Sequence, residues 1–292
     1  MLSRGARLVH RVTAVAYLGF GGLLFLAPAW AAERFPWTVS PFVAMTIGGW
    51  CIGVTCFSWI GGRRGPIGAV LPVLAFVWLF GLSEIAVVLL DKPIFRVEAP
   101  LAAPYVLSLA LTLASGGFGL LELAHRAAGG VDIHGDAGAG LDRRIRWLLL
   151  ALGAALGALA VATAFSGDVS TATSGKVFPE AITRFTVRAF AALNLSMAIG
   201  ALVAGAQESR TAGAWLALAA AFLLVPTLAA AVANLGAFDF ANRPLGWLYL
   251  GGYAVLLAGS LAFAWAHRDV FRRVTGVSAA VEAAASEPMA TA

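Results

Sequence analysis

The sequence predicts an all-α integral membrane protein with about eight transmembrane helices, arranged as two parallel four-helix repeats. Three observations support this prediction. The chain of 292 residues is 60% hydrophobic and 12% charged, whereas soluble domains contain about 25% charged residues. Apolar runs with few or no charges recur along almost the whole chain, and each is long enough to span a bilayer. The two halves of the chain also match each other in sequence.

Each of the apolar runs is expected to form one membrane-crossing helix, because a helix rises about 1.5 Å per residue. In chain order the runs cover residues 12–31, 39–60, 67–90, 101–124, 146–165, 185–206, 212–235 and 245–266. The first run also resembles a secretory signal, with basic residues before it and Ala27-Pro28-Ala29-Trp30-Ala31 as a cleavage site. We expect it to stay attached, because its removal would leave the span at 146–165 without a counterpart.

The basic residues predict the orientation of the spans. If the spans alternate, 13 of the 20 Lys and Arg residues fall on one side. They are Arg4, Arg7, Arg11, Arg63, Arg64, Arg126, Arg143, Arg144, Arg146, Arg210, Arg268, Arg272 and Arg273. Cytoplasmic loops are enriched in Lys and Arg. Both termini are therefore predicted to be cytoplasmic.

The internal match defines the domain organisation. Phe35-Pro36 falls on Phe178-Pro179, and at the same offset Phe42 falls on Phe185. Because each half has an even number of spans, both halves point the same way and are related by an approximate two-fold axis along the membrane normal. We predict a first repeat at 1–126, a cytoplasmic linker at 127–143, a second repeat at 144–273 and a disordered tail at 274–292.

Small residues at helical spacing predict close helix contacts inside this bundle. The pairs Gly49 with Gly53 and Gly153 with Gly157 are each four residues apart, so their members share a helix face. Helices in a bilayer associate by close backbone approach, which small residues permit. Packing alone accounts for these residues.

Short apolar motifs resemble those of an uncharacterised family of bacterial multi-span membrane proteins. The motif is Phe35-Pro36-Trp37, then Pro41-Phe42, then Gly48-Gly49-Trp50, with a second copy at Phe185-Thr186-Val187-Arg188. That family has no assigned activity. The resemblance implies the bacterial cytoplasmic (inner) membrane as location and transfers no site residues. Met45 stands where the second copy has Arg188, so a charged site here would be asymmetric.

Four polar residues in the spans are the candidate ligand-binding residues: Glu84, Arg184, Arg188 and Asn194. Ionisable groups inside a bilayer cost about 2.5–3.5 kcal/mol near the centre, so each needs a partner or a role. We expect Glu84 and Arg188 to share a small cavity that opens outward, with Arg184 at its mouth and Asn194 at its floor. The ligand would be anionic or a lipid head group. A salt bridge that only fixes helix register is the structural alternative.

Other kinds of site have less support in the sequence. His10, His125 and His267 each precede an arginine at the cytoplasmic edge of a span, where we expect them to face water rather than a haem or a metal. Trp37, Phe95, Phe178, Phe238 and Phe240 are expected to form an aromatic belt at the membrane surface. No catalytic residue, metal site or cofactor is predicted. Cys51 and Cys56 are expected to be buried, unpaired thiols.

Three classes of function remain open. The repeat architecture and the few buried charges favour a non-enzymatic protein that is transporter-like or binds a lipid or another lipophile. An accessory or scaffold subunit of a larger membrane complex is the alternative, and a membrane-embedded enzyme is the third. The scarcity of charges in the spans argues against an ion-coupled pump. Expected partners are membrane lipids, another membrane protein or a second copy of the chain, and not nucleic acid, because the basic residues lie in short loops.

Overall fold

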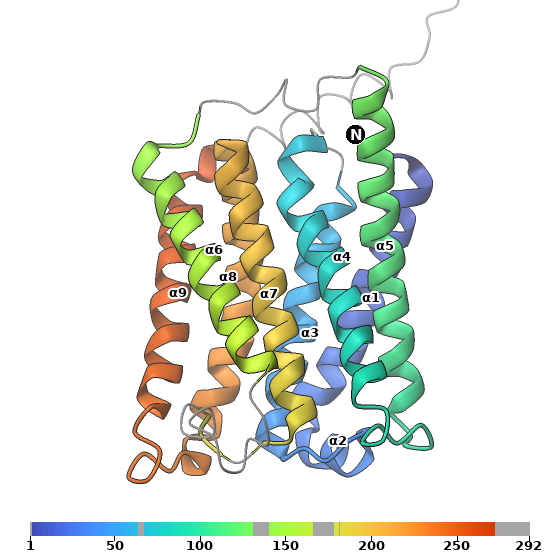
Figure 1. Cartoon of the computed structure of the whole chain (residues 1–292), viewed down its shortest axis with the longest axis vertical. Helices are drawn as coiled ribbons and strands as arrows, with labels where there is room; N and C mark the ends of the chain where they lie inside the picture. Colours follow the sequence, from blue (N-terminus) through green and yellow to red (C-terminus); the bar gives the residue numbers. More distant parts are fainter. Residues whose placement is uncertain (1, 64–66, 131–139, 166–177, 181, 272–292) are drawn as a thin grey trace, which may run out of the picture.

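A computed structural model describes residues 2–63, 67–130, 140–165, 178–180 and 182–271. Within these ranges the chain is all-helical and forms no β-strand (Figure 1). The helices are α1 (Arg4–Leu26), α2 (Pro28–Arg34), α3 (Pro41–Gly61), α4 (Ile67–Leu90), α5 (Ala102–Ala128), α6 (Arg143–Ala164), α7 (Arg184–Gln207), α8 (Arg210–Ala233) and α9 (Gly246–Ala266), with a 3₁₀ turn at Leu235–Ala237. Most of the predicted linker, at 131–139, and the predicted tail, at 274–292, lie outside the described residues.

Eight of these helices, all except α2, are long and apolar enough to cross a membrane, as in a polytopic membrane protein. The eight predicted runs are thus confirmed as helices. The first differs most from its prediction. It begins at Arg4, because the Ser3 hydroxyl accepts a hydrogen bond from the Ala6 N–H and caps the helix. It ends at Leu26, and Pro28 starts the short helix α2 in a new direction.

The long helices run alternately up and down between two ends of the bundle (Figure 1). One end, here called the α2 end, contains α2 and the segments between α4 and α5 and between α8 and α9. The opposite end, here called the N-terminal end, contains the start of α1. Polar caps define several helix starts: the hydroxyls of Ser40, Thr183 and Ser209 accept N–H bonds at the starts of α3, α7 and α8.

The packing joins the first four long helices to the last four along two parallel seams. In the first half, α1 packs against α3 and α5, and α4 packs against α5. In the second half, α6 packs against α7, and α8 packs against α9. Between the halves, α3 packs against α8 and α4 against α7, and α4 also contacts α8.

Glycines permit close approach at these seams, as the small-residue pattern predicts. A Cβ on Gly53 of α3 would lie 2.5 Å from the Cβ of Leu223 in α8, and one on Gly49 would lie 3.0 Å from the Thr227 nitrogen. A Cβ on Gly153 of α6 would lie 2.7 Å from the Leu202 side chain of α7. Such distances leave no room for a side chain, so these glycines set the spacing of the helices.

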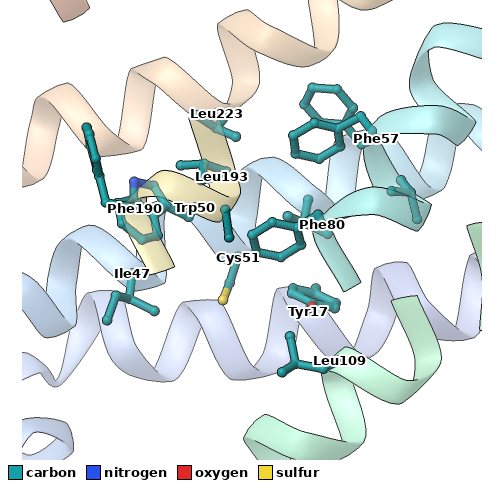
Figure 2. Packing of buried hydrophobic residues seen from close by; sticks show 14 of the residues in the cluster. Tyr17, Ile47, Trp50, Cys51, Phe57, Phe80, Leu109, Phe190, Leu193 and Leu223 are labelled. Atoms are coloured by element: carbon teal, nitrogen blue, oxygen red, sulfur yellow. The ribbon is translucent and has the colours of Figure 1, made fainter. Parts of the chain in front are cut away.

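Large aromatic side chains fill the core between the seams. Phe57 of α3 stacks on Phe76 of α4, with ring centroids 3.8 Å apart. Figure 2 shows Tyr17, Cys51, Phe80 and Leu109 gathered in one region of this core. Cys51 is buried, Cys56 is half-buried, and both are free thiols, as predicted.

Candidate functional site

An ion-paired cluster of Asp91, Arg184 and Arg188 joins the two halves at the α2 end. Arg188 donates from Nη1 to both carboxylate oxygens of Asp91, at 2.8 and 2.9 Å. Arg184 donates from Nε to Oδ1 at 3.0 Å, and its Nη2 lies 2.9 Å from the same oxygen. The pairing follows from local structure: Asp91 closes the last turn of α4, and the two arginines occupy the first turns of α7, on one helix face.

The cluster has more positive than negative charge. The Asp91 side chain is fully buried, whereas the side chains of Arg184 and Arg188 keep 43% and 25% of their surface exposed. One carboxylate faces two guanidinium groups, so one positive charge is not balanced within the cluster. The partly exposed guanidinium groups are therefore available to an anionic group that approaches from the α2 end, because guanidinium matches carboxylate and phosphate geometry.

The other seam between the halves contains a neutral contact at the corresponding positions. There the side-chain amide of Asn234, at the end of α8, lies 3.4 Å from the sulfur of Met45 in α3 and also donates to the Ala230 carbonyl. At the offset that aligns the two halves, Asn234 corresponds to Asp91, and Arg188 corresponds to Met45. At the α2 end, the contact of α4 with α7 is thus charged, whereas the corresponding contact of α8 with α3 is neutral.

Glu84 lies in a separate buried site, toward the middle of α4. It is 2% exposed, and the Tyr105 hydroxyl of α5 donates a 2.9 Å hydrogen bond to its Oε2. It lines a cavity of about 20 Å³ together with Tyr17, Cys51 and Ser108. This volume holds about one water molecule.

The predicted pairing of Glu84 with Arg188 is therefore wrong. Glu84 precedes Asp91 by seven residues, so it lies about 10 Å from Asp91 along α4, farther from the α2 end. The start of α7 therefore lies beside Asp91 and not beside Glu84. Neither arginine lines the cavity beside Glu84. Asn194 is not its floor either, because its amide donates to the Phe190 carbonyl of its own helix at 2.8 Å. Ligand binding by these four residues stays a prediction.

The predicted aromatic belt is also wrong for most of its members. Trp37, Phe95, Phe178 and Phe238 are between 1% and 8% exposed and belong to the core. Trp37 stacks on Phe185 with centroids 3.9 Å apart, and its indole N–H donates to Thr186. Rings of α7 contact Trp37, Phe95 and Phe178, and rings of α3 and α9 contact Phe238. These four side chains therefore close the α2 end of the core instead of lining its rim.

His10 differs from its prediction as well. His125 is exposed and His267 half-buried, but His10 is fully buried beside Gly61 and Gly119. The glycines leave space for its ring between α3 and α5. No group of three or more metal-ligating side chains occurs among the described residues.

Comparisons with other proteins do not assign the chain to a family. No protein-family model, curated protein or solved structure matches this chain. The candidate site therefore rests on its own contacts and charges.

Sequence reasoning missed Asp91, the residue that organises the charged cluster. It immediately follows the apolar run 67–90 and resembles an ordinary loop acid beside Lys92. One signal points to it: when the two halves of the sequence are aligned, Asp91 falls on Asn234 and Arg188 falls on Met45, so both charged residues replace neutral ones. That signal is apparent only when the contacts of α4 with α7 and of α8 with α3 are compared.

Proposed function

We propose that this chain is a transporter-like protein of the bacterial cytoplasmic membrane that binds an anionic ligand or lipid head group at Arg184 and Arg188. In this proposal two parallel four-helix repeats meet at the charged and the neutral seam. The observation that carries the proposal is the excess positive charge at one seam, half-exposed at the α2 end, where the corresponding seam is neutral. The bacterial location rests on the resemblance of the Phe35-Pro36-Trp37 motif.

Matching contacts at the ends of α4 and α8 support the repeat. The N–H of Ile94 bonds to the Asp91 carbonyl at 2.8 Å, and the N–H of Ala237 bonds to the Asn234 carbonyl at 2.9 Å. Both pairs of positions correspond at the offset that aligns the halves. The seams correspond too, since exchanging the halves turns the contact of α4 with α7 into that of α8 with α3. These correspondences favour parallel repeats.

The charged seam offers a way to couple ligand binding to movement, because it lies between the two halves. In parallel-repeat transporters, substrates bind at the interface of the repeats. An anion that pairs with the arginines would compete with Asp91 for the same donors. Its binding would therefore loosen the contact between α4 and α7, which couples ligand binding to movement of the halves.

The test compares ligand binding by the wild type and by the double variant D91N/R188M. This variant places the pair found at the other seam, Asn234 with Met45, at positions 91 and 188, so the bundle is expected to fold. Arg184 remains, but it no longer has a second guanidinium group beside it with which to hold an anion. Proteins reconstituted in nanodiscs would be titrated with phosphatidylglycerol, and in separate experiments with inorganic phosphate, and bound ligand measured by native mass spectrometry. We expect the wild type to retain the anionic ligand and D91N/R188M to lose it. Binding to phosphate alone would identify a soluble anion as the ligand, and binding to the lipid alone a head group.

A matched control is Lys92→Gln, which removes one positive charge from the same end of the bundle outside the cluster. We expect this variant to bind like the wild type. Equal binding by the wild type and D91N/R188M, or equal loss in both variants, would refute a specific site at the arginines.

The proposed topology places the N-terminal end in the cytoplasm and the α2 end outside. The distribution of Lys and Arg supports it, and so does the alternation of the eight long helices. Reporter fusions at Lys92, Gly135 and Thr275 test it: we expect an external signal from the first and cytoplasmic signals from the other two. An external signal from Gly135 would contradict the topology.

The exposure of α6 and α9 favours a second function, that of an accessory subunit. Only 17% of the apolar window of α6 and 11% of that of α9 are buried within the bundle. A larger membrane complex could use these faces for contact with a partner. Co-purification of a stoichiometric membrane protein, together with unchanged association in D91N/R188M, would favour this function over ligand binding.

A further inference from the structure

A line of buried polar side chains lies in the first half of the bundle, where α1 packs against α5. On α1 it comprises His10, Thr13 and Tyr17, each 1% exposed or less. On α5 it comprises Tyr105, Ser108, Thr112 and Ser115, each 5% exposed or less. Spacings of three, four and seven residues place each set on one helix face. On α5 the line covers about 20 Å from Tyr105 to Gly119, beside which His10 lies.

Two contacts between α1 and α5 lie along this line. The Thr13 hydroxyl lies 3.2 Å from the Leu111 carbonyl of α5 and 2.9 Å from the Val9 carbonyl of its own helix. The Tyr17 hydroxyl lies close to those of Ser108 and Thr112, without a hydrogen bond of good geometry. The line therefore runs between the helices and not along two separate surfaces.

Glu84 lies at the end of the line that is nearer to the α2 end. The titratable groups around it are Tyr105 of α5, Tyr17 of α1 and Cys51 of α3. Among the described residues, no basic side chain lies within ion-pair distance of Glu84. Burial of a carboxylate without a cationic partner is costly, so such surroundings favour a proton on the carboxyl group. Beyond Glu84, the rings of Trp37 and Phe185 close the α2 end.

His10 lies at the other end of the line, near the N-terminal end of the bundle. Its ring lies beside Gly61 of α3 and Gly119 of α5, close to Leu74 of α4. Within the described part of the chain, neither ring nitrogen has a hydrogen-bond partner. The same is true of the hydroxyls of Tyr17 and Ser58. Buried polar groups of this kind normally bond to internal water, and the cavity at Glu84 has room for one molecule.

The second half of the chain lacks this line. At the offset that aligns the halves, His10, Thr13 and Tyr17 correspond to Gly153, Leu156 and Ala160. Ser108, Thr112 and Ser115 likewise correspond to Gly251, Val255 and Ala258. Glu84 corresponds to Thr227. The polar groups therefore belong to the first half alone, and helices of this type pack without them.

We propose that Glu84 is a proton-binding site and that the line of hydroxyl groups to His10 exchanges its proton with the N-terminal end of the bundle. This inference concerns a different part of the molecule from the arginine site and does not depend on it. The low number of charged residues in the spans argues against an ion-coupled pump only if every step of proton transfer needs an ionisable carboxylate or base. Hydroxyl groups and one imidazole perform the same task here.

The transfer is a chain of proton exchanges with no change in oxidation state. A neutral imidazole accepts a proton at one nitrogen and releases the proton from the other. Each hydroxyl, or a water molecule between two hydroxyls, binds the arriving proton and passes its own proton onward. At the last step the Glu84 carboxylate gains the proton and becomes a carboxylic acid. The reverse sequence returns the proton to His10.

The first experiment identifies the protonated carboxyl group. Dicyclohexylcarbodiimide reacts with protonated carboxyl groups in apolar surroundings, and peptide mass spectrometry of the liposome-reconstituted chain locates the label. We expect Glu84 to be labelled at neutral pH and the labelling to fall at alkaline pH. Glu122 is the matched carboxyl, because its ion pair with Arg126 at 2.6 Å keeps it ionised, and we expect it to stay unlabelled. Absence of label from Glu84 at neutral pH would overturn the proposal.

The second experiment measures exchange along the line. Infrared spectroscopy in deuterated buffer follows the carbonyl stretch of the Glu84 acid, which E84Q assigns by removing it. We expect Thr112→Val to slow the exchange roughly tenfold or more. Thr227→Val is the matched control, since both threonines are fully buried and both donate 2.7 Å bonds to a carbonyl one turn back. We expect it to exchange like the wild type.

A purely structural role predicts a different outcome. If the hydroxyl groups only hold α1 against α5, Thr112→Val would lower thermal stability and leave the exchange at the wild-type rate or faster. That result, or equal slowing by Thr112→Val and Thr227→Val, would overturn the proposal.

Discussion

Replacement of Asp91 with alanine tests how much the charged seam contributes to the stability of the bundle. The substitution removes the acceptor of the arginine bonds at 2.8, 2.9 and 3.0 Å. It leaves two guanidinium groups close together without a counter-charge. Loss of one member of a buried ion pair costs about 3–5 kcal/mol. Here water solvates part of each arginine, since the exposed fractions of Arg184 and Arg188 are 43% and 25%. We therefore expect the free energy of unfolding to fall by about 2–4 kcal/mol.

The double variant D91N/R188M is expected to lie within about 1 kcal/mol of the wild type, because neutral replacement of a buried ion pair costs little when the site repacks. The variant is designed after the contact of Asn234 with Met45 at the other seam. The two variants together distinguish two contributions to the free energy of unfolding: the destabilisation by an unpaired charge, and the stabilisation by the ion pair relative to a neutral contact.

Cys51 provides the assay, because this free thiol is buried in the core. In a Cys56→Ser background, the rate at which a thiol reagent modifies Cys51 reports how often the bundle opens. A loss of about 2–4 kcal/mol corresponds to roughly 30- to 1000-fold faster modification. Lys92→Ala serves as the control at the same end. Modification of D91A at the wild-type rate, or of D91N/R188M as fast as D91A, would refute the reasoning.

Two further predictions concern packing and pH. Gly53→Ala is expected to destabilise the bundle by about 1–3 kcal/mol, because its Cβ would lie 2.5 Å from that of Leu223 and the helices would have to separate. Gly19→Ala, with nothing within 4 Å, is expected to be neutral or stabilising by up to about 1 kcal/mol, and equal Cys51 reactivity in both variants would contradict this. Burial and the neighbouring Arg210 lower the pKa of His267, whose Nδ1 accepts a 3.0 Å bond from Arg210 Nε. A lowered folded-state pKa stabilises the fold above about pH 6.5, and this contribution is lost as the pH falls through the folded-state value. We therefore expect the thermal midpoint, followed by tryptophan fluorescence, to fall on acidification more in the wild type than in His267→Gln, and parallel pH profiles would rule this out.

Several features of the fold could be predicted from the sequence because each depends on local composition. The eight long helices follow from apolar runs. The close approach of a neighbouring helix to Gly53 follows from small residues at helical spacing, whereas the identity of that helix, α8, does not. The ion pair of Glu122 with Arg126 follows from their separation of four residues on one helix. In each case the relevant distance lies along one helix or depends on a single helix face.

The partners of the polar residues were decided by the tertiary structure. Hydropathy places a residue along the membrane normal but does not specify which helix lies beside it. Arg188 was therefore assigned to Glu84, although the end of α4 brings Asp91 to it. In the same way, the burial of Trp37 and of His10 depends on neighbours distant in the sequence. The sequence by itself determined that eight long apolar helices form, because each depends on the composition of its own segment. The tertiary structure determined which side chains form ion pairs and which lie along the proposed proton path, because such contacts depend on how the helices are arranged around one another.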